Sequence, residues 1–227
     1  TEEIRKAFDE KGLTLKQGYG LTEMGPGVFA LDPWDARRKA GSIGKPNYLV
    51  DVRVVDEEGR DVGPNMDGEL LLRGPSVFGG YWQMPDETAR TFEGGWLHTG
   101  DLVRYDEEGY FYIVGRKKFV IRSGAESIYP WEVEEVIKAH PKVADVLVIG
   151  VPDEKWGEVP KALVVVKEGE TLTGEELVRF CEGKLARYKI PRYIQFVKEI
   201  PRSPVGKVIW SEVRARYGQP GGDYVRK

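Results

Sequence analysis

Apolar positions follow two different periods along this chain. Residues 4–8 repeat apolar side chains at helical spacing, and residues 13–17 read as a short strand. Between Gly41 and Gly115, short apolar runs are separated by turn signals, which predicts strands joined by tight turns. The first part of the chain is therefore expected to be rich in β structure.

The tetrad DEEG occurs twice in this part, at Asp56–Gly59 and Asp106–Gly109, each time between apolar runs. Glycine reaches positive φ angles without a steric cost, and aspartate favours the start of a turn. Both tetrads are thus predicted to be hairpin turns with glycine at a positive φ angle.

After Gly115 the pattern changes to alternating strands and helices. A helix is predicted at 130–140 and another at 173–185, where Thr173 and Glu176 have the spacing of a capping box. The remaining segments are predicted strands at 143–151, 162–169 and 192–200, a closing helix at 208–217 and a loose tail at 218–227. We therefore expect a compact α+β domain, and the basic stretch GRKK marks its boundary.

Composition excludes several classes of function. The 227 residues carry a formal net charge of −3, with no basic block that would favour nucleic acid. No apolar run approaches the roughly 18–20 residues of a membrane span. A secretory leader is not visible, and the single cysteine, Cys181, suits a reducing compartment. One cysteine and two histidines also cannot assemble a usual zinc site. We predict a cytoplasmic protein.

The stretch QGYGLTE has residue types that suit a nucleotide site. Gly18 and Gly20 let backbone N–H groups approach an anion, and Tyr19 offers a flat face for a base. Thr22 can bond a phosphate oxygen, and Glu23 has the carboxylate that Mg²⁺ prefers. A glycine-rich turn with a capping threonine is the alternative.

Three later motifs contain further candidate residues. In HTGD, Asp101 follows a tight turn and can accept the hydroxyls of a ribose; an ordinary turn is the alternative. GRKKFVIRSG contains Arg116 and Arg122, which suit a diol or phosphate, or form a solvated basic loop. In PRSPVGK, Lys207 follows a proline-stiffened loop and can neutralise developing charge, or is a surface lysine before a helix.

Together the motifs resemble those of the adenylate-forming enzymes, which include acyl-CoA synthetases, peptide-synthetase adenylation domains and beetle luciferases. The resemblance runs through GYGLTE, GELLLRGPSVFGGYW, GWLHTGD, GRKKFVIRSGAESIYPWEVE and PRSPVGK, in that order. It implies an α/β plus α+β fold. Residues 1–117 would be a β-barrel-like remnant of a large N-terminal domain, and 118–227 a small, mobile α+β lid domain.

The resemblance also implies roles for the QGYGLTE residues. Tyr19 would stack on adenine, with Gly18 and Gly20 lining its pocket. Thr22 would contact the α-phosphate of ATP, and Glu23 would bind Mg²⁺. These five residues would form the adenine and phosphate part of the site.

Other residues receive roles in the same way. Asp101 and Arg116 would hold the ribose hydroxyls, and Lys207 would bridge the carboxylate and phosphate during adenylation. Lys118 would be the hinge about which the small domain rotates between the two half-reactions. The loop Ser123–Gly124–Ala125, with Arg122 nearby, would then approach the pantetheine thiol of CoA.

The sequence departs from the family pattern at three places. Phe119 stands where an acidic residue is common, Trp210 where a basic one is common, and residues 124–127 read GAES in place of Gly-Gly-Glu-Asn. None of these changes removes a residue with a catalytic role.

The implied activity is an ATP-dependent carboxylate–CoA ligase that uses ATP, Mg²⁺ and CoA, with a fatty acid as the expected substrate and a homodimer left open. The family's phosphate loop is missing from these residues. We therefore expect a piece of a longer synthetase that is inactive alone. Alternatives are an enzyme that loads a carrier protein and a non-catalytic nucleotide-binding module; nothing selects a light-emitting oxygenase.

Overall fold

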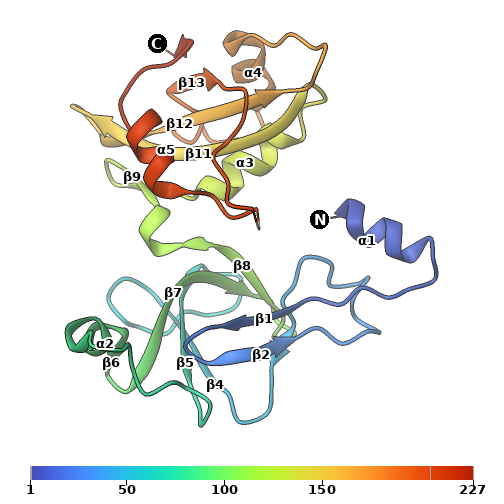
Figure 1. Ribbon diagram of the computed structural model, residues 1–227, viewed down its shortest axis with the longest axis vertical. Coiled ribbons are helices and arrows are strands. Elements are labelled where there is room, and N and C mark those ends of the chain that lie inside the picture. The colour runs from blue at the N-terminus through green and yellow to red at the C-terminus, as the bar shows by residue number, and fades with distance from the viewer. Residues whose placement is uncertain (1, 205, 227) are drawn as a thin grey trace. The chain divides into compact units, whose positions relative to one another are not determined.

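The computed structural model in Figure 1 describes residues 2–204 and 206–226. Val205, which belongs to the PRSPVGK motif, lies outside the described residues, as do the two terminal residues. The chain separates into two compact units, residues 1–117 and residues 118–227.

The N-terminal unit contains two antiparallel sheets. Its elements are α1 (Glu2–Asp9), β1 (Gly18–Leu21), β2 (Gly25–Ala30), β3 (Lys45–Pro46), β4 (Asp51–Val55), β5 (Gly68–Arg73), α2 (Pro85–Thr91), β6 (Phe92–Glu93), β7 (Trp96–Tyr105) and β8 (Phe111–Arg116). The smaller sheet has the order β1-β2-β3. The larger sheet has the order β4-β5-β7-β6, and β8 also pairs with β7.

The expectation of a barrel-like unit is wrong. Among the described strands, β4 pairs with β5 only, and its other edge carries just an isolated bridge from Val55 to Asp61, so the larger sheet does not close on itself. The two sheets instead share an apolar core, in which Phe29 of β2 packs with Leu70 and Leu72 of β5. Core packing and an isolated bridge between Gly44 and Phe111 therefore join the two sheets, without the continuous hydrogen-bonded closure that a barrel requires.

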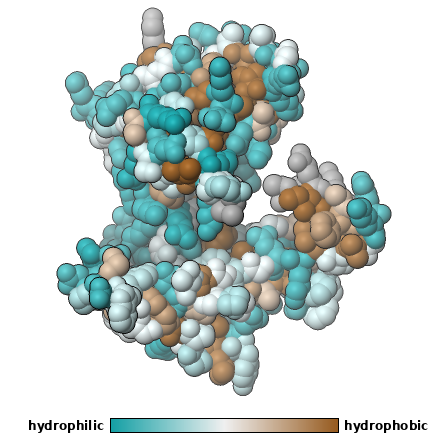
Figure 2. Space-filling model, viewed as in Figure 1, coloured by the Kyte–Doolittle hydropathy of each residue, from teal (hydrophilic) through white to brown (hydrophobic). Residues whose placement is uncertain are grey.

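The start of the chain differs from its sequence pattern at one segment. The predicted helix at 4–8 is confirmed as α1, but residues 13–17 form no strand, and β1 begins at Gly18. Leu13 and Leu15 are exposed, so their alternation has no sheet to pack against. Hydrophobic surface is visible around α1 in Figure 2.

Both DEEG tetrads form the predicted turns. Gly59 and Gly109 have φ angles of 77° and 78°. In each turn the aspartate side chain accepts a hydrogen bond from the N–H two residues later, at 3.0 Å. The predicted hairpin turns are therefore confirmed.

The C-terminal unit is a mixed sheet with helices on both faces. After the 3₁₀ turn η1 (Lys117–Phe119), its elements are β9 (Ile121–Ser123), β10 (Glu126–Ile128), α3 (Pro130–Lys138), β11 (Val143–Asp153), β12 (Gly157–Val166), α4 (Gly174–Cys181), β13 (Tyr193–Phe196), α5 (Trp210–Tyr217) and β14 (Tyr224–Val225). The strand order is β10-β9-β12-β13-β14, with β11 paired to β12. Only β12 and β13 are parallel among the described strand pairs of this sheet.

Alternation along β11 divides the core of this unit between the two faces of the sheet. Val146 and Val148 face the cluster that contains α3 and α4, whereas Leu147 and Ile149 face the cluster that contains Val213 of α5. Successive side chains of a strand point to opposite faces, so a continuous apolar run indicates burial on both sides.

Two predictions for this unit concern the start of α4 and the end of the chain. The Thr173 side chain accepts a hydrogen bond from the Glu176 N–H at 3.2 Å, which confirms Thr173 as the N-cap of α4. The expectation of a loose tail is wrong, because Tyr224 lies in β14, paired with β13, and packs against Gly174. No helix of the described residues is long and apolar enough to cross a membrane.

Candidate functional site

Three predicted site residues meet in the N-terminal unit. Asp101 and Arg116 are cross-strand partners in β7 and β8, and the Arg116 Nε lies 2.7 Å from Asp101 Oδ1. The Tyr19 hydroxyl, from β1, donates to Asp101 Oδ2 at 2.6 Å. The register of one sheet and the position of the first strand of the other therefore bring these side chains together.

The Asp101 carboxylate is buried, with the residue 4% exposed. Among the described residues, each of its two oxygens has one side-chain partner, Arg116 for Oδ1 and Tyr19 for Oδ2, which leaves further lone pairs to accept hydroxyl groups. Its backbone N–H donates to the Thr99 hydroxyl at 3.1 Å, and that hydroxyl donates to the Leu70 carbonyl at 2.7 Å. Asp101 is thus held in place before any ligand binds.

Burial, and then the hydrogen bond to Asp101, raise the pKa of Tyr19. The phenol therefore stays protonated and acts as a donor at neutral pH. Its ring lies edge-on to Phe29, with centroids 5.8 Å apart and planes at 77°. This contact and the hydrogen bond fix the orientation of the Tyr19 ring.

Glu69 is a buried carboxylate that the sequence analysis missed. From β5 it pairs with Lys117 Nζ at 2.7 Å, accepts the Gly100 N–H at 3.3 Å and lies 3.4 Å from His98 Nδ1. It is 5% exposed. It holds the turn directly before Asp101, and a charged residue inside the apolar run GELLLRG was the available signal.

Thr22 and Glu23 lie in the turn between β1 and β2. Thr22 is exposed, and the Tyr81 hydroxyl donates to Glu23 Oε1 at 2.6 Å. No cluster of three or more potential metal ligands occurs among the described residues. A single carboxylate still fits Mg²⁺, because this ion usually takes its other ligands from phosphates and water.

Gly18 and Gly20 are explained by strand pairing as well as by the predicted approach of backbone N–H groups to an anion. A Cβ on Gly20 would lie 2.7 Å from the Gly25 carbonyl oxygen, and one on Gly18 would lie 3.1 Å from the Phe29 oxygen. Both contacts are with the backbone of β2, which cannot move aside cheaply. Glycine at position 20 is therefore needed for close strand pairing, whereas a side chain at position 18 would require the neighbouring strand to shift by a few tenths of an ångström.

The remaining predicted residues lie in the C-terminal unit. Lys207 is exposed, and its side chain has no acidic partner among the described residues. Its backbone is fixed, because the Ser203 N–H donates to the Lys207 carbonyl at 2.7 Å and the Gly206 N–H donates to the Ser203 carbonyl at 2.8 Å. Gly206 has a φ angle of +81°, which favours glycine at this turn.

The segment that begins at Gly124 forms a tight turn beside an aromatic ring. Gly124 has a φ angle of +62°, and its N–H donates to the Trp156 carbonyl at 2.7 Å. A Cβ there would lie 3.1 Å from the Trp156 ring. Arg122 donates to the Ser127 hydroxyl at 2.6 Å. Lys118, in η1, is exposed.

The comparisons with known proteins identify the family. Residues 1–82 match the family model described as AMP-binding enzyme, and residues 132–207 match the one described as AMP-binding enzyme C-terminal domain. The chain belongs to the AMP-binding enzyme family. This confirms the resemblance found in the motifs.

Several similar proteins are named as CoA ligases or CoA synthases. A feruloyl-CoA synthase from Amycolatopsis is 42% identical over 216 residues, which cover 95% of this chain and 44% of that protein. A 2-succinylbenzoate–CoA ligase from Bacillus cereus is 44% identical over 211 residues, which cover 93% of this chain and 43% of that protein. The chain therefore spans less than half the length of these relatives.

A solved structure supports the same assignment. The o-succinylbenzoate CoA synthetase of Bacillus subtilis, in complex with its acyl-adenylate intermediate, matches with a TM-score of 0.83 and 34% identity. The match covers 96% of this chain and 44% of that one. Another structure of that enzyme contains ATP and a magnesium ion.

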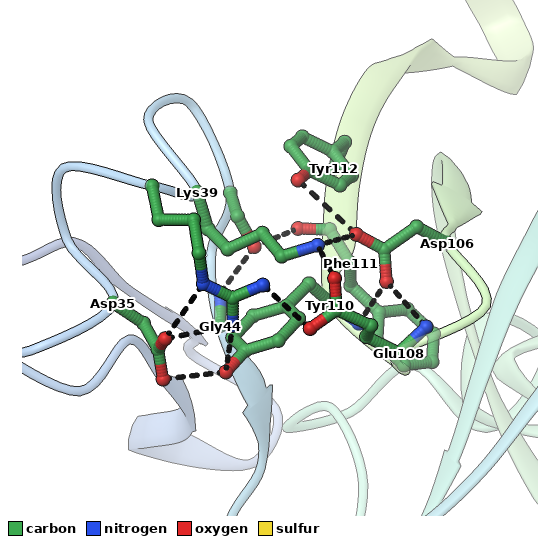
Figure 3. Close-up of polar contacts among 10 residues, drawn as sticks. Asp35, Lys39, Gly44, Asp106, Glu108, Tyr110, Phe111 and Tyr112 are labelled. Carbon is green, nitrogen blue, oxygen red and sulfur yellow. Dashed lines mark hydrogen bonds and ion pairs between the residues drawn. The ribbon is translucent and has the colours of Figure 1, made fainter.

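A second polar cluster of this AMP-binding chain, shown in Figure 3, lies outside the predicted site. Lys39 Nζ lies 2.7 Å from Asp106 and 2.6 Å from Glu108, and Arg38 bridges Asp35 and Glu108. Hydrogen bonds to Asp106 and Glu108 raise the pKa of Lys39. These ion pairs tie residues 35–39 to the second DEEG turn, and both cations of the cluster, Arg38 and Lys39, are already paired with carboxylates.

Proposed function

We propose that this chain is part of an ATP-dependent carboxylate–CoA ligase. A carboxylate attacks the α-phosphate of ATP, which gives an acyl-adenylate and pyrophosphate. The CoA thiol then attacks the acyl carbonyl, and AMP leaves. The family assignment and the CoA ligases among the similar proteins support this reaction.

The contact of Tyr19, Asp101 and Arg116 is the observation that carries the proposal. A buried carboxylate with spare lone pairs, beside a half-exposed guanidinium, suits the two vicinal hydroxyls of a ribose. We assign these hydroxyls to Asp101 and Arg116, and the adenine to the face of Tyr19. Gly18 and Gly20, on the same strand, would border the base.

Thr22 and Glu23 are assigned to the phosphate end of the nucleotide. Thr22 presents an exposed hydroxyl that can donate to the α-phosphate, and Glu23 keeps one carboxylate oxygen beyond its bond to Tyr81. Glu23 would hold Mg²⁺, which supplies positive charge that neutralises phosphate oxygens.

Lys207 is assigned to charge stabilisation during adenylation. An ammonium group is most useful there if no carboxylate of its own protein neutralises it, which is its state among the described residues. Lys118 is assigned as the hinge of the C-terminal unit. The Gly124 turn, with Arg122 beside it, is assigned to the pantetheine arm of CoA in the second half-reaction.

The acid substrate is proposed only as a class. The names of the similar proteins contain feruloyl, succinylbenzoate and indoleacetate groups, so aryl-substituted carboxylic acids come first in a substrate panel. The fatty acid expected from the sequence stays a prediction and belongs in the same panel. A cytoplasmic location and a homodimer also stay predictions.

The test uses the longest protein that contains this chain, with ATP, Mg²⁺, CoA and the acid panel, and identifies products by mass. Formation of acyl-CoA and AMP supports the proposal. Acyl-adenylate without thioester indicates a carrier-protein acceptor, and AMP binding without product indicates a non-catalytic module. The 227-residue chain alone is expected to show no ATP–pyrophosphate exchange, since it spans less than half of its relatives.

A further inference from the structure

Two aromatic side chains far apart in the sequence stack within the C-terminal unit. The ring centroids of Phe119 and Trp210 are 3.9 Å apart, and their planes are at 23°. Phe119 is the last residue of η1, directly after Lys118, and Trp210 is the first residue of α5. Both side chains are half-buried. The stack therefore joins the start of the unit to the segment that follows Lys207.

The stack is supported on both sides. Lys118 Nζ lies 5.1 Å from the centroid of the Phe119 ring, within the range of a cation–π contact. Trp210 packs on the apolar cluster that contains Ile149 and Val213. A small cavity of about 80 Å³ is lined by both rings and by Lys118. Trp210 thus anchors the stack to the apolar core on this face of the sheet.

The segment between Pro201 and Trp210 is held at its base. The Ile209 N–H donates to the Pro201 carbonyl at 2.9 Å, and Arg202 pairs with Val208 in an isolated β-bridge. The Arg202 guanidinium also reaches Asp145 of β11 at 3.0 Å and the Gly206 carbonyl at 3.2 Å. With its base closed, the position of this loop depends on the contacts of its two ends.

We propose that the Phe119–Trp210 stack is a positioning contact for Lys207. The stack fixes the loop of residues 201–209 to Phe119, the residue after the hinge. The Lys207 ammonium then follows the movement of the hinge segment, and the loop does not move independently. This inference rests on the roles proposed for Lys207 and for Lys118 as the hinge. Neither Phe119 nor Trp210 touches a substrate in this account.

The chemistry of the contact gives it a testable signature. An ion pair at a half-exposed site weakens as salt screens it, whereas stacked rings depend on apolar area and ring geometry. The stack is therefore expected to hold the loop equally well at low and high ionic strength.

The first test is structural and needs no activity. Hydrogen exchange is measured in the 227-residue chain at the amides of Ser203, Gly206 and Lys207, for the unchanged chain and for Trp210→Leu and Phe119→Leu. Both variants are expected to exchange about tenfold faster at these amides, with the β11 amides unchanged. Phe119→Tyr, which keeps a ring, is expected to exchange at the original rate.

The control for this test is Phe180→Leu, which removes a different ring contact of the same unit, that with His140. It should leave the loop amides unchanged. Equal exchange at the loop amides in all variants overturns the proposal, whether or not the protein is a ligase. Faster exchange throughout the unit in both leucine variants also overturns it, because the stack would then be a general core contact.

The second test measures the two half-reactions separately, in the longest protein that contains this chain and forms acyl-CoA. Trp210→Leu is expected to slow adenylation by about 10–100-fold, because small misplacements of a catalytic group are costly. It should leave thioesterification from supplied acyl-adenylate unchanged, and should add no further loss to Lys207→Ala. Equal losses in both half-reactions overturn the positioning role.

A paired exchange provides the rescue. The double variant Phe119→Asp with Trp210→Arg is expected to regain much of the loop protection at low salt and to lose it at high salt. Each single variant should stay defective. Failure of the double variant at low salt contradicts the view that contact between these two positions is what holds the loop. If loop protection behaves as expected but no adenylation is found, the proposed function fails and the structural contact stands.

Discussion

The carboxylate of Asp101 and the ammonium of Lys207 are two charged groups that differ in burial and in the number of charged partners. Asp101 is buried in a sheet and already has Tyr19 and Arg116 as partners. Lys207 is exposed at a turn whose backbone is fixed, with no acidic partner among the described residues. The first arrangement suits recognition of neutral hydroxyls by a prepared acceptor. The second keeps a positive charge available for a reaction step.

Removal of the free charge should have the largest effect. Lys207→Ala is expected to slow acyl-adenylate formation about 10²–10³-fold, the usual loss when one group that stabilises transition-state charge is removed. Thioesterification from supplied acyl-adenylate should change little. The two half-reactions are measured separately, with Lys198→Ala as a matched control for an exposed lysine of the same unit. An equal loss in both variants would contradict the assigned role.

Removal of the prepared charge should have a smaller effect. Asp101→Asn is expected to weaken ATP or AMP binding about 10–100-fold, since hydrogen bonds to a charged group contribute about 1.5–3 kcal/mol. Binding is measured by titration calorimetry. Asp106→Asn is the control, because it loses an ion pair with Lys39 in the same unit but lies outside the predicted site. Nucleotide binding weakened equally by both changes would show a general loss of folding.

The Gly124 turn tests the second half-reaction. Gly124→Ala combines a positive φ angle, which costs about 1–2 kcal/mol for a residue with a Cβ, with a contact at 3.1 Å to Trp156. Thioesterification is expected to slow about tenfold while adenylation is retained. Gly183→Ala has the same kind of backbone strain, at a φ angle of +74°, with open space around its Cβ. It should lower stability without changing either rate; a thioesterification loss in both would remove the role assigned to Gly124.

Local chemistry made several parts of this structure predictable. The DEEG turns and the Thr173 cap follow from the conformational preferences of glycine, aspartate and threonine. The motif order was enough to identify the family. Hydrophobic period also located α3 and β11, because both bury apolar side chains at regular spacing.

What the sequence did not predict depends on partners that are distant along the chain. Residues 13–17 alternate like a strand but have no neighbour to pair with. Glu69 lies in an apolar run, and its partners Lys117 and Gly100 follow only from the strand register. The contact between Phe119 and Trp210 also joins residues that are distant along the chain. The sequence analysis noted each residue separately and did not predict that their rings stack.

A pH experiment compares Asp101 with another carboxylate. Glu134 of α3 accepts the Val148 N–H at 2.8 Å but, unlike Asp101, forms no ion pair among the described residues. Burial raises the pKa of Glu134 above its value in the unfolded chain. Its contribution to stability is therefore complete below the unfolded pKa and is lost as the pH rises through the folded pKa.

Glu134→Gln should remove this pH dependence, because the amide cannot ionise and its oxygen can still accept from Val148. The difference in unfolding free energy between variant and parent should favour the variant more at pH 8 than at pH 4, by about 1.4 kcal/mol for each unit of pKa difference. Urea unfolding at both pH values measures it, with Glu135→Gln as the exposed control on the same helix. If the difference is the same at both pH values, burial costs Glu134 nothing when it ionises. In that case a buried carboxylate in this protein would not need a cation for stability. The pairing of Asp101 with Arg116 would then be explained by function alone.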